Sequence, residues 1–221
     1  MVEHGIARRA FLLGCASVGA SALAGCASTI DGTSIATEPG SDPKYARMYA
    51  SVPDERFPIP AVDLAKVDPK YLRRNVPDPT GERPGSVVVD TAQRFLYLVG
   101  DDGRAMRYGV GIGKAGFEWS GSAMIARKQA WPTWTPPAEM IKREPELEEW
   151  RSGMPPGLEN PLGSRALYIF DNGIDTLYRL HGTLETWSIG KAVSSGCVRL
   201  LNQDVIDLYR RVPAATRIVV A

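Results

Sequence analysis

Short apolar runs separated by turn residues recur along the C-terminal two thirds of the chain. The runs are rich in β-branched and aromatic residues, as in "VVVD" at 87–90 and "FLYLV" at 95–99. Such runs are typical of strands, and "GDDG" at 100–103 is typical of a hairpin turn between two of them. The pattern predicts strands over residues 87–90, 95–99, 106–110, 165–170, 177–182 and 217–221.

One segment near the C-terminus has a helical pattern instead. Val205, Leu208 and Val212 recur at helical spacing, and Asn202 stands where a helix N-cap is expected. The chain therefore predicts a mostly β domain with one short helix close to its C-terminus.

Two long segments carry no sustained pattern. Residues 27–84 are interrupted by prolines, so we expect a flexible tether followed by an extended arm that lies against the domain. Residues 116–163 hold four of the five tryptophans and show little strand periodicity. This Trp-rich insertion is either a binding loop or lid over a cleft, or an irregular segment that its tryptophans anchor to the core.

Composition narrows the class of protein. The 221 residues suffice for one sizeable domain with an appendage, and 17 prolines with 22 glycines favour turns and short strands over a helical bundle. The formal net charge is +1. Because nucleic-acid binders usually carry a basic face or tail, this balance argues against nucleic acid as a partner.

Residues 1–26 are expected to be an export signal. Arg8 and Arg9 precede a short apolar run, a pattern that resembles a twin-arginine signal. The run ends in "LAGC", which resembles a bacterial lipobox with Cys26 as the lipidated residue; an ordinary cleaved signal peptide is the alternative. Ala27 follows where an aspartate would favour inner-membrane retention. The expected location is therefore the periplasmic face of the envelope, with a lipid anchor in the outer membrane.

Removal of this signal leaves one free thiol, Cys197, and one imidazole, His181, sixteen residues apart. No intramolecular disulfide can then form. A thiol beside an imidazole can attack an acyl group, because the imidazole accepts the thiol proton. The alternative is a small buried cysteine and an unrelated core histidine. A zinc site would need three or four ligands, and two are present, so no metal is expected.

The residues around this pair suit acyl chemistry. A backbone carbonyl near His181 could fix its tautomer, since no Asp or Asn stands at a suitable position. The N–H groups of Gly196 and Cys197 could donate to a developing oxyanion, and Gly196 would allow a carbonyl to approach closely.

The run "HGT…IGKAVSSGCVRLLNQD" resembles the signature of the L,D-transpeptidase catalytic domain family, and the resemblance extends over residues 86–221. It implies a β-sandwich-like catalytic domain at 85–221, after a signal at 1–26 and a tether and arm at 27–84. Cys197 matches the nucleophile and His181 the base. Further matches are Gly182, whose carbonyl would orient the base, Arg199, which would bind a substrate carboxylate or brace the loop, and Gly163 and Gly190 in the pocket walls.

The resemblance also implies a reaction that needs no cofactor. The cysteine is acylated by a peptidoglycan stem peptide with loss of D-alanine, and the acyl group passes to an amine of another stem, a D-amino acid or a wall-attached protein. Transfer to water would make the protein an L,D-carboxypeptidase or amidase, and a non-catalytic wall-binding lipoprotein is a third reading. Ser195 departs from the family pattern, which often has histidine there; it could hold the loop or donate to substrate.

Overall fold

The computed structural model describes residues 42–115 and 119–221. The expected export signal at 1–26, with Cys26 and Ala27, and the tether residues up to 41 lie outside the described residues. Within the described part, no helix has the length and apolarity needed to cross a membrane.

The domain is built on a nine-stranded sheet with strand order β1-β4-β3-β2-β11-β6-β7-β8-β10. A separate pair, β5 with β9, lies alongside it. Most neighbours are antiparallel, but β11 runs parallel to β2, and β10 runs parallel to β8. The strands are β1 (Arg74–Pro77), β2 (Val87–Asp90), β3 (Phe95–Val99), β4 (Arg104–Gly109), β5 (Ile112–Gly113), β6 (Gly121–Ala130), β7 (Arg165–Asp171), β8 (Ile174–Thr183), β9 (Ala192–Ser194), β10 (Val198–Leu201) and β11 (Thr216–Val220).

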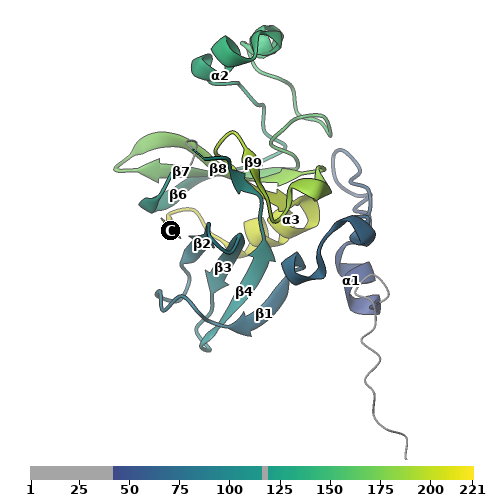
Figure 1. Cartoon of the computed structure of the whole chain (residues 1–221), viewed down its shortest axis with the longest axis vertical. Helices are drawn as coiled ribbons and strands as arrows, with labels where there is room; N and C mark the ends of the chain where they lie inside the picture. Colours follow the sequence, from purple (N-terminus) through teal and green to yellow (C-terminus); the bar gives the residue numbers. More distant parts are fainter. Residues whose placement is uncertain (1–41, 116–118) are drawn as a thin grey trace, which may run out of the picture. The chain divides into compact units, whose positions relative to one another are not determined.

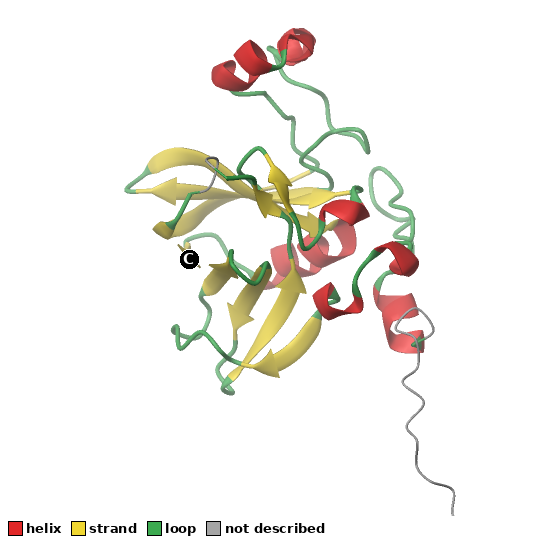
Figure 2. Cartoon of the chain, viewed as in Figure 1, coloured by secondary structure: helices red, strands yellow, loops and turns green. Residues whose placement is uncertain are grey.

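The sheet folds back on itself, so that β1–β4 and β6–β8 form two layers (Figure 1). One apolar cluster joins the layers: Val87 and Leu96 from the first contact the same core as Leu167 and Leu180 from the second. Figure 2 shows the predominance of strands. The expectation of a mostly β, sandwich-like domain is confirmed.

Strand β6 was not predicted, although it is central to the sheet. It pairs with β11 on one side and β7 on the other. Only Ala123 and Ile125 are buried along its ten residues, and the rest of the strand is polar or exposed. An apolar alternation of only two positions is too short to be read as a strand.

The C-terminal helix is α3 (Asn202–Arg211), as predicted. The predicted cap is wrong, because Leu201 is the N-cap residue and Asn202 begins the helix. The Asn202 side chain is buried and its Oδ1 accepts a hydrogen bond from the backbone N–H of Ser164 at 3.0 Å. A tertiary contact has therefore replaced the local one.

The arm expected to be extended contains short helices. They are α1 (Pro43–Met48) and the 3₁₀ turns η2 (Leu64–Lys66) and η3 (Pro69–Tyr71), and the arm then adds β1 to the sheet edge. Aspartates 42, 63 and 68 cap these turns, each side chain accepting from the N–H two residues on. Each turn is too short for helical periodicity to reveal it.

The insertion carries α2 (Ala138–Arg143) and the 3₁₀ turn η4 (Pro145–Trp150) (Figure 1). Trp131, at its base, is an anchor: it is buried, packs edge-on to Phe57 at 4.9 Å, and donates from Nε1 to Glu55 at 2.9 Å. Trp134 and Trp150 instead line a cavity. The anchoring reading therefore holds for Trp131, and the binding-loop or lid reading stays a prediction for Trp134 and Trp150.

Candidate active site

The cysteine and the histidine lie on adjacent strands of the sheet. Strands β8 and β10 pair in parallel with Arg199 opposite His181, so Cys197, just before β10, lies beside Arg179. Because side chains alternate across a sheet, these four side chains share one face. Leu180, Val198 and Leu200 occupy the other face and join the core.

His181 is 4% exposed and held by its own backbone neighbour. Its Nδ1 lies 2.9 Å from the carbonyl oxygen of Gly182. Since a carbonyl can only accept, Nδ1 carries the proton and Nε2 keeps a free lone pair. Burial lowers the pKa of His181 to about 4, although the hydrogen bond to the Gly182 carbonyl opposes this shift. The nearby positive charges of Arg199 and Arg179 lower the pKa further.

The thiol of Cys197 is half-buried and also neutral at rest. Sγ lies 3.8 Å from the carbonyl oxygen of Leu177, to which the thiol donates. Burial raises the pKa of this thiol. The backbone N–H of Arg179 and the charges of Arg179 and Arg199 oppose that shift without cancelling it.

A buried serine ties the loop before the nucleophile. Ser194 Oγ donates to the Cys197 carbonyl at 2.6 Å and accepts from the Gly196 N–H at 3.2 Å. Gly196 has φ of 125°, in the region that favours glycine. The N–H of Gly196 is thus already bonded to Ser194 Oγ, whereas the N–H of Cys197 has no acceptor among the described residues. The sequence did not predict a role for Ser194, because the run "SSGC" does not show which of its two serines has a buried side chain.

A bulge in β8 brings the carbonyl of Leu177 to the sulfur. The β7–β8 register shifts between Tyr168 and Phe170, and Leu177 has φ of 65°, which is unusual for a residue other than glycine. Thr176 holds the bulge, its Oγ donating to the Ile169 carbonyl at 2.7 Å and accepting from the Tyr178 N–H at 3.2 Å. No sequence signal marks Leu177.

Two cavities meet at Cys197, beneath the insertion. The first, about 500 Å³, extends over β6, β7 and β8 and is lined by three arginines and one glutamate: Arg127, Arg143, Arg179 and Glu139. The second, about 380 Å³, contains His181, Arg199, Glu144 and Glu159. Five residues border both cavities, namely Trp134, Met140, Leu162, Ser195 and Cys197.

Of the other residues that the sequence singled out, Arg199 borders a cavity, and three glycines lie in tightly packed parts of the fold. Arg199 forms an ion pair with Glu185 at the second cavity. A side chain on Gly182 would place Cβ 2.2 Å from Asn202 Oδ1, and one on Gly190 would place it 2.1 Å from the Tyr71 ring, so both backbones are tightly packed. Gly163 lies against the Gly182 carbonyl. Neither Gly163 nor Gly190 lines the two cavities.

Among residues 42–115 and 119–221, no group of three or more His, Cys, Asp or Glu side chains is arranged to hold a metal ion.

Known proteins resemble this chain over the same region. Residues 84–220 match the model of the L,D-transpeptidase catalytic domain. The "Probable L,D-transpeptidase ErfK/SrfK" of Escherichia coli is 37% identical over 146 residues, which cover 63% of this chain and 44% of the relative. The "Probable L,D-transpeptidase YbiS" of the same organism is 36% identical over 148 residues, covering 65% and 45%. The chain thus spans less than half the length of these relatives.

A solved structure from Brucella melitensis is 46% identical and covers 72% of this chain and 99% of that one, with a TM-score of 0.50. It is named as a probable carnitine operon oxidoreductase, whereas the matching domain model and both E. coli relatives are named for L,D-transpeptidases.

Proposed function

Because the chain belongs to the L,D-transpeptidase catalytic domain family, we propose that it transfers the acyl group of a peptidoglycan stem peptide through a thioester on Cys197. The observation that carries this proposal is the thiol at the junction of two cavities, one of which also contains a buried, neutral imidazole. A nucleophile reached from two sides suits a reaction with two successive substrates.

In the first half-reaction, Sγ of Cys197 attacks the carbonyl carbon between diaminopimelate and the terminal D-alanine. Nε2 of His181 takes the thiol proton, since Nδ1 is held on the Gly182 carbonyl. The C–N bond then breaks, and Nε2 gives its proton to the departing amine of D-alanine. The product is a thioester and a free D-alanine.

In the second half-reaction, an amine attacks the thioester carbonyl. His181 accepts a proton from that amine, the C–S bond breaks, and the sulfur leaves and recovers the proton. During both steps the N–H of Cys197 is the backbone donor available to the oxyanion. Gly196 contributes its backbone conformation rather than its N–H, which Ser194 occupies.

The second cavity favours an amine acceptor over water. Glu144 and Glu159 line it, and carboxylates attract the ammonium form of an approaching amine. Arg199 borders this cavity too, where it either meets substrate or braces the loop through Glu185. Hydrolysis to a tripeptide is the second candidate, because the half-buried thiol leaves water with access to the same thioester.

The proposal extends to location. The pattern of residues 1–26 supports export and a lipid anchor on Cys26, which would hold the enzyme at the periplasmic face of the envelope, on the outer membrane. The partners are then stem peptides, with a wall-attached protein as a further acceptor. Mass spectrometry of the mature N-terminus tests the anchor: a diacylated or triacylated Cys26 supports it, and an unmodified N-terminus at another residue contradicts it.

Incubation of the purified protein with disaccharide tetrapeptide tests the reaction. Cross-linked dimers and free D-alanine are expected, identified by mass spectrometry. Tripeptide without dimer would show a hydrolase, and an unchanged substrate would show a binding protein. In the same assay Cys197→Ala should form no product and no covalent adduct with a carbapenem; an adduct on that variant would contradict the nucleophile assignment.

A further inference from the structure

A row of side chains crosses the floor of the first cavity and ends at the nucleophile. Arg127 on β6 is opposite Tyr168 on β7, and Tyr168 is opposite Arg179 on β8. The guanidinium carbons of Arg127 and Arg179 lie 3.8 Å and 4.5 Å from the centre of the Tyr168 ring. The next position across the sheet is that of Cys197. The row therefore places one cation, Arg179, on the strand beside the reacting sulfur and a second, Arg127, two strands further away on the same face of the sheet.

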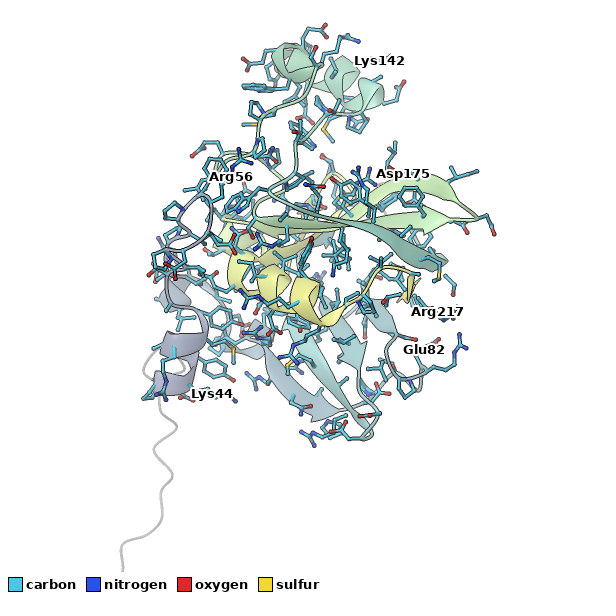
Figure 3. The ribbon with its side chains drawn as sticks, turned by 180° about the vertical axis from the view of Figure 1, so that it is seen from behind. Lys44, Arg56, Glu82, Lys142, Asp175 and Arg217 are labelled. Carbon is cyan, nitrogen blue, oxygen red and sulfur yellow. The ribbon has the colours of Figure 1, made fainter. Side chains whose placement is uncertain are left out.

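Arg179 is fixed in orientation but keeps donors to spare. Its side chain is 13% exposed. Nη1 and Nη2 donate hydrogen bonds to the carboxylate of Asp175 at 2.7 and 2.9 Å. The second hydrogen of Nη1 is donated to the Tyr178 carbonyl at 3.0 Å. Figure 3 labels Asp175 on this part of the sheet. Nε–H and the second Nη2–H have no partner among the described residues. These two hydrogens form one edge of the guanidinium, which matches a carboxylate in a bidentate pair.

Arg127 contributes an uncompensated charge. It is exposed, stacks on Tyr168, and has no carboxylate partner in the described part of the chain. Tyr168 beneath it is 5% exposed, so the guanidinium stacks on a buried ring of the cavity floor.

We propose that Arg127 and Arg179 bind carboxylates of the donor, so that this enzyme selects stem peptides whose acidic groups are free over stems in which they are amidated. This inference rests on the proposed function and names the substrate class of the same site. Arg179, one strand from Cys197, takes the carboxylate nearest the scissile carbonyl. Arg127 lies three strand spacings, or roughly 14 Å, from Cys197. It therefore binds a carboxylate further along the donor peptide.

The charge of the two cavities is consistent with this division. In the first cavity Arg179 is paired with Asp175, and Arg127 adds a positive charge with no carboxylate partner in the described part of the chain. In the second cavity Arg199 is paired with Glu185, and Glu144 and Glu159 add negative charge. An anionic donor and a cationic acceptor would therefore approach Cys197 from different sides.

Steady-state kinetics with two donors test the inference. One is disaccharide tetrapeptide with free carboxylates, and the other is the same compound with its stem carboxylates amidated. Arg127→Gln should raise the KM of the free-acid donor about tenfold, the loss of one charge-assisted contact, and leave kcat within about twofold. The KM of the amidated donor should not change. Arg179→Lys keeps the charge but loses the bidentate edge, so it should raise the KM of the free-acid donor as well.

Arg107→Gln is the matched control. Arg107 also stacks on an aromatic ring, that of Phe95 at 4.1 Å, and lies on β4, so the same change in charge and stacking occurs away from the cavity. Equal KM values for Arg127→Gln and Arg107→Gln would overturn the inference. An equal rise for both donors would overturn it too, because the effect would then not depend on carboxylates.

A binding experiment separates this inference from the proposed function. Calorimetric titration of Cys197→Ala with the two tetrapeptides needs no turnover. A preference for the free-acid form that Arg127→Gln weakens supports the inference even if the wild-type protein catalyses nothing. Absence of any preference in this titration contradicts it even if the wild-type protein is an active transpeptidase.

Discussion

At the scale of single residues, burial keeps both members of the catalytic pair uncharged. It lowers the pKa of His181 to about 4 and raises that of Cys197, so the resting enzyme has a thiol and an imidazole instead of a thiolate and an imidazolium. The thiol donates to the Leu177 carbonyl in this state. In the proposed mechanism, attack on a substrate is therefore coupled to proton transfer to Nε2 of His181.

The rate of acylation should be flat between about pH 5 and 8 and fall on the acid side with a midpoint near pH 4. Lowering the pH through the pKa of His181 protonates the only base, so the rate falls about tenfold per unit below it. Single-turnover acylation by tetrapeptide across this range measures the midpoint, with circular dichroism at each pH as the control for folding. A midpoint close to 6.5 would mean that His181 is not desolvated in solution.

The sequence predicted the site residues whose side chains would react, and it did not predict the residues that act through backbone atoms. Cys197 and His181 are the one cysteine and the one histidine among the described residues, and they lie in a recognisable motif. Leu177 and Ser194 contribute a carbonyl position and a loop bond. Any residue has a carbonyl, so only the fold reveals which one reaches the sulfur.

At the scale of elements, the bulge in β8 is strained at Leu177. A left-handed backbone costs an L-residue about 1–2 kcal/mol, and 59% of this side chain is exposed, so little burial compensates for it. Leu177→Gly should therefore raise the free energy of unfolding by about 1 kcal/mol, and Leu177→Val should lower it by a similar amount. Urea denaturation measures both. Equal destabilisation by both substitutions would show that the side chain, and not φ, matters there.

Helix α3 contains a buried carboxyl group, that of Asp204. Its Oδ2 accepts from Tyr49 at 3.1 Å, its Oδ1 lies 3.5 Å from Nε of Arg73, and burial raises its pKa to about 7 despite that arginine. A raised folded pKa stabilises the protein fully below about pH 4, and the contribution is lost as the pH rises through 7.

Asp204→Asn should accordingly become more favourable relative to wild type as the pH rises from 4 to 8. The difference between their free energies of unfolding, measured by denaturation at each pH, isolates Asp204 from the opposite effect of His181, which both proteins share. A difference that stays constant across this range would contradict the assignment.

The elements predicted from the sequence are those in which apolar alternation and burial coincide, such as β2, β3 and α3. Strand β6 was missed because polar or exposed residues occupy most of its positions; one of them, Arg127, lines the first cavity. The short turns of the arm were missed because they are stabilised by aspartate caps and tertiary contacts rather than by amphipathic periodicity.

At the scale of the whole molecule, the arm supports the base of the insertion. Glu55 accepts from Arg165 of β7 and from Trp131, and both charged side chains are 11% exposed. Phe57 and Ile59 of the arm extend this contact into an apolar cluster with Trp131 and Ile206. The base of the insertion is thus held by a segment that precedes residues 85–221 in sequence.

Glu55→Ala should cost about 3 kcal/mol in the free energy of unfolding, because it leaves the guanidinium of Arg165 buried without its partner. Glu148→Ala is the control, since its pair with Arg151 is more than half exposed and should contribute far less to stability than the pair of Glu55 with Arg165. Thermal and chemical denaturation compare the two. Similar losses for both variants would mean that the arm contact is no stronger than a surface ion pair.

The neutral state of Cys197 also affects how long the enzyme survives. Peroxides oxidise thiolates rather than thiols, and a sulfenic acid at this position would have no second cysteine in the described chain to restore it through a disulfide. By raising the pKa of the thiol, burial slows this damage between encounters with substrate. Burial thus leaves the protein without a preformed thiolate, and the same burial slows oxidation of the resting thiol.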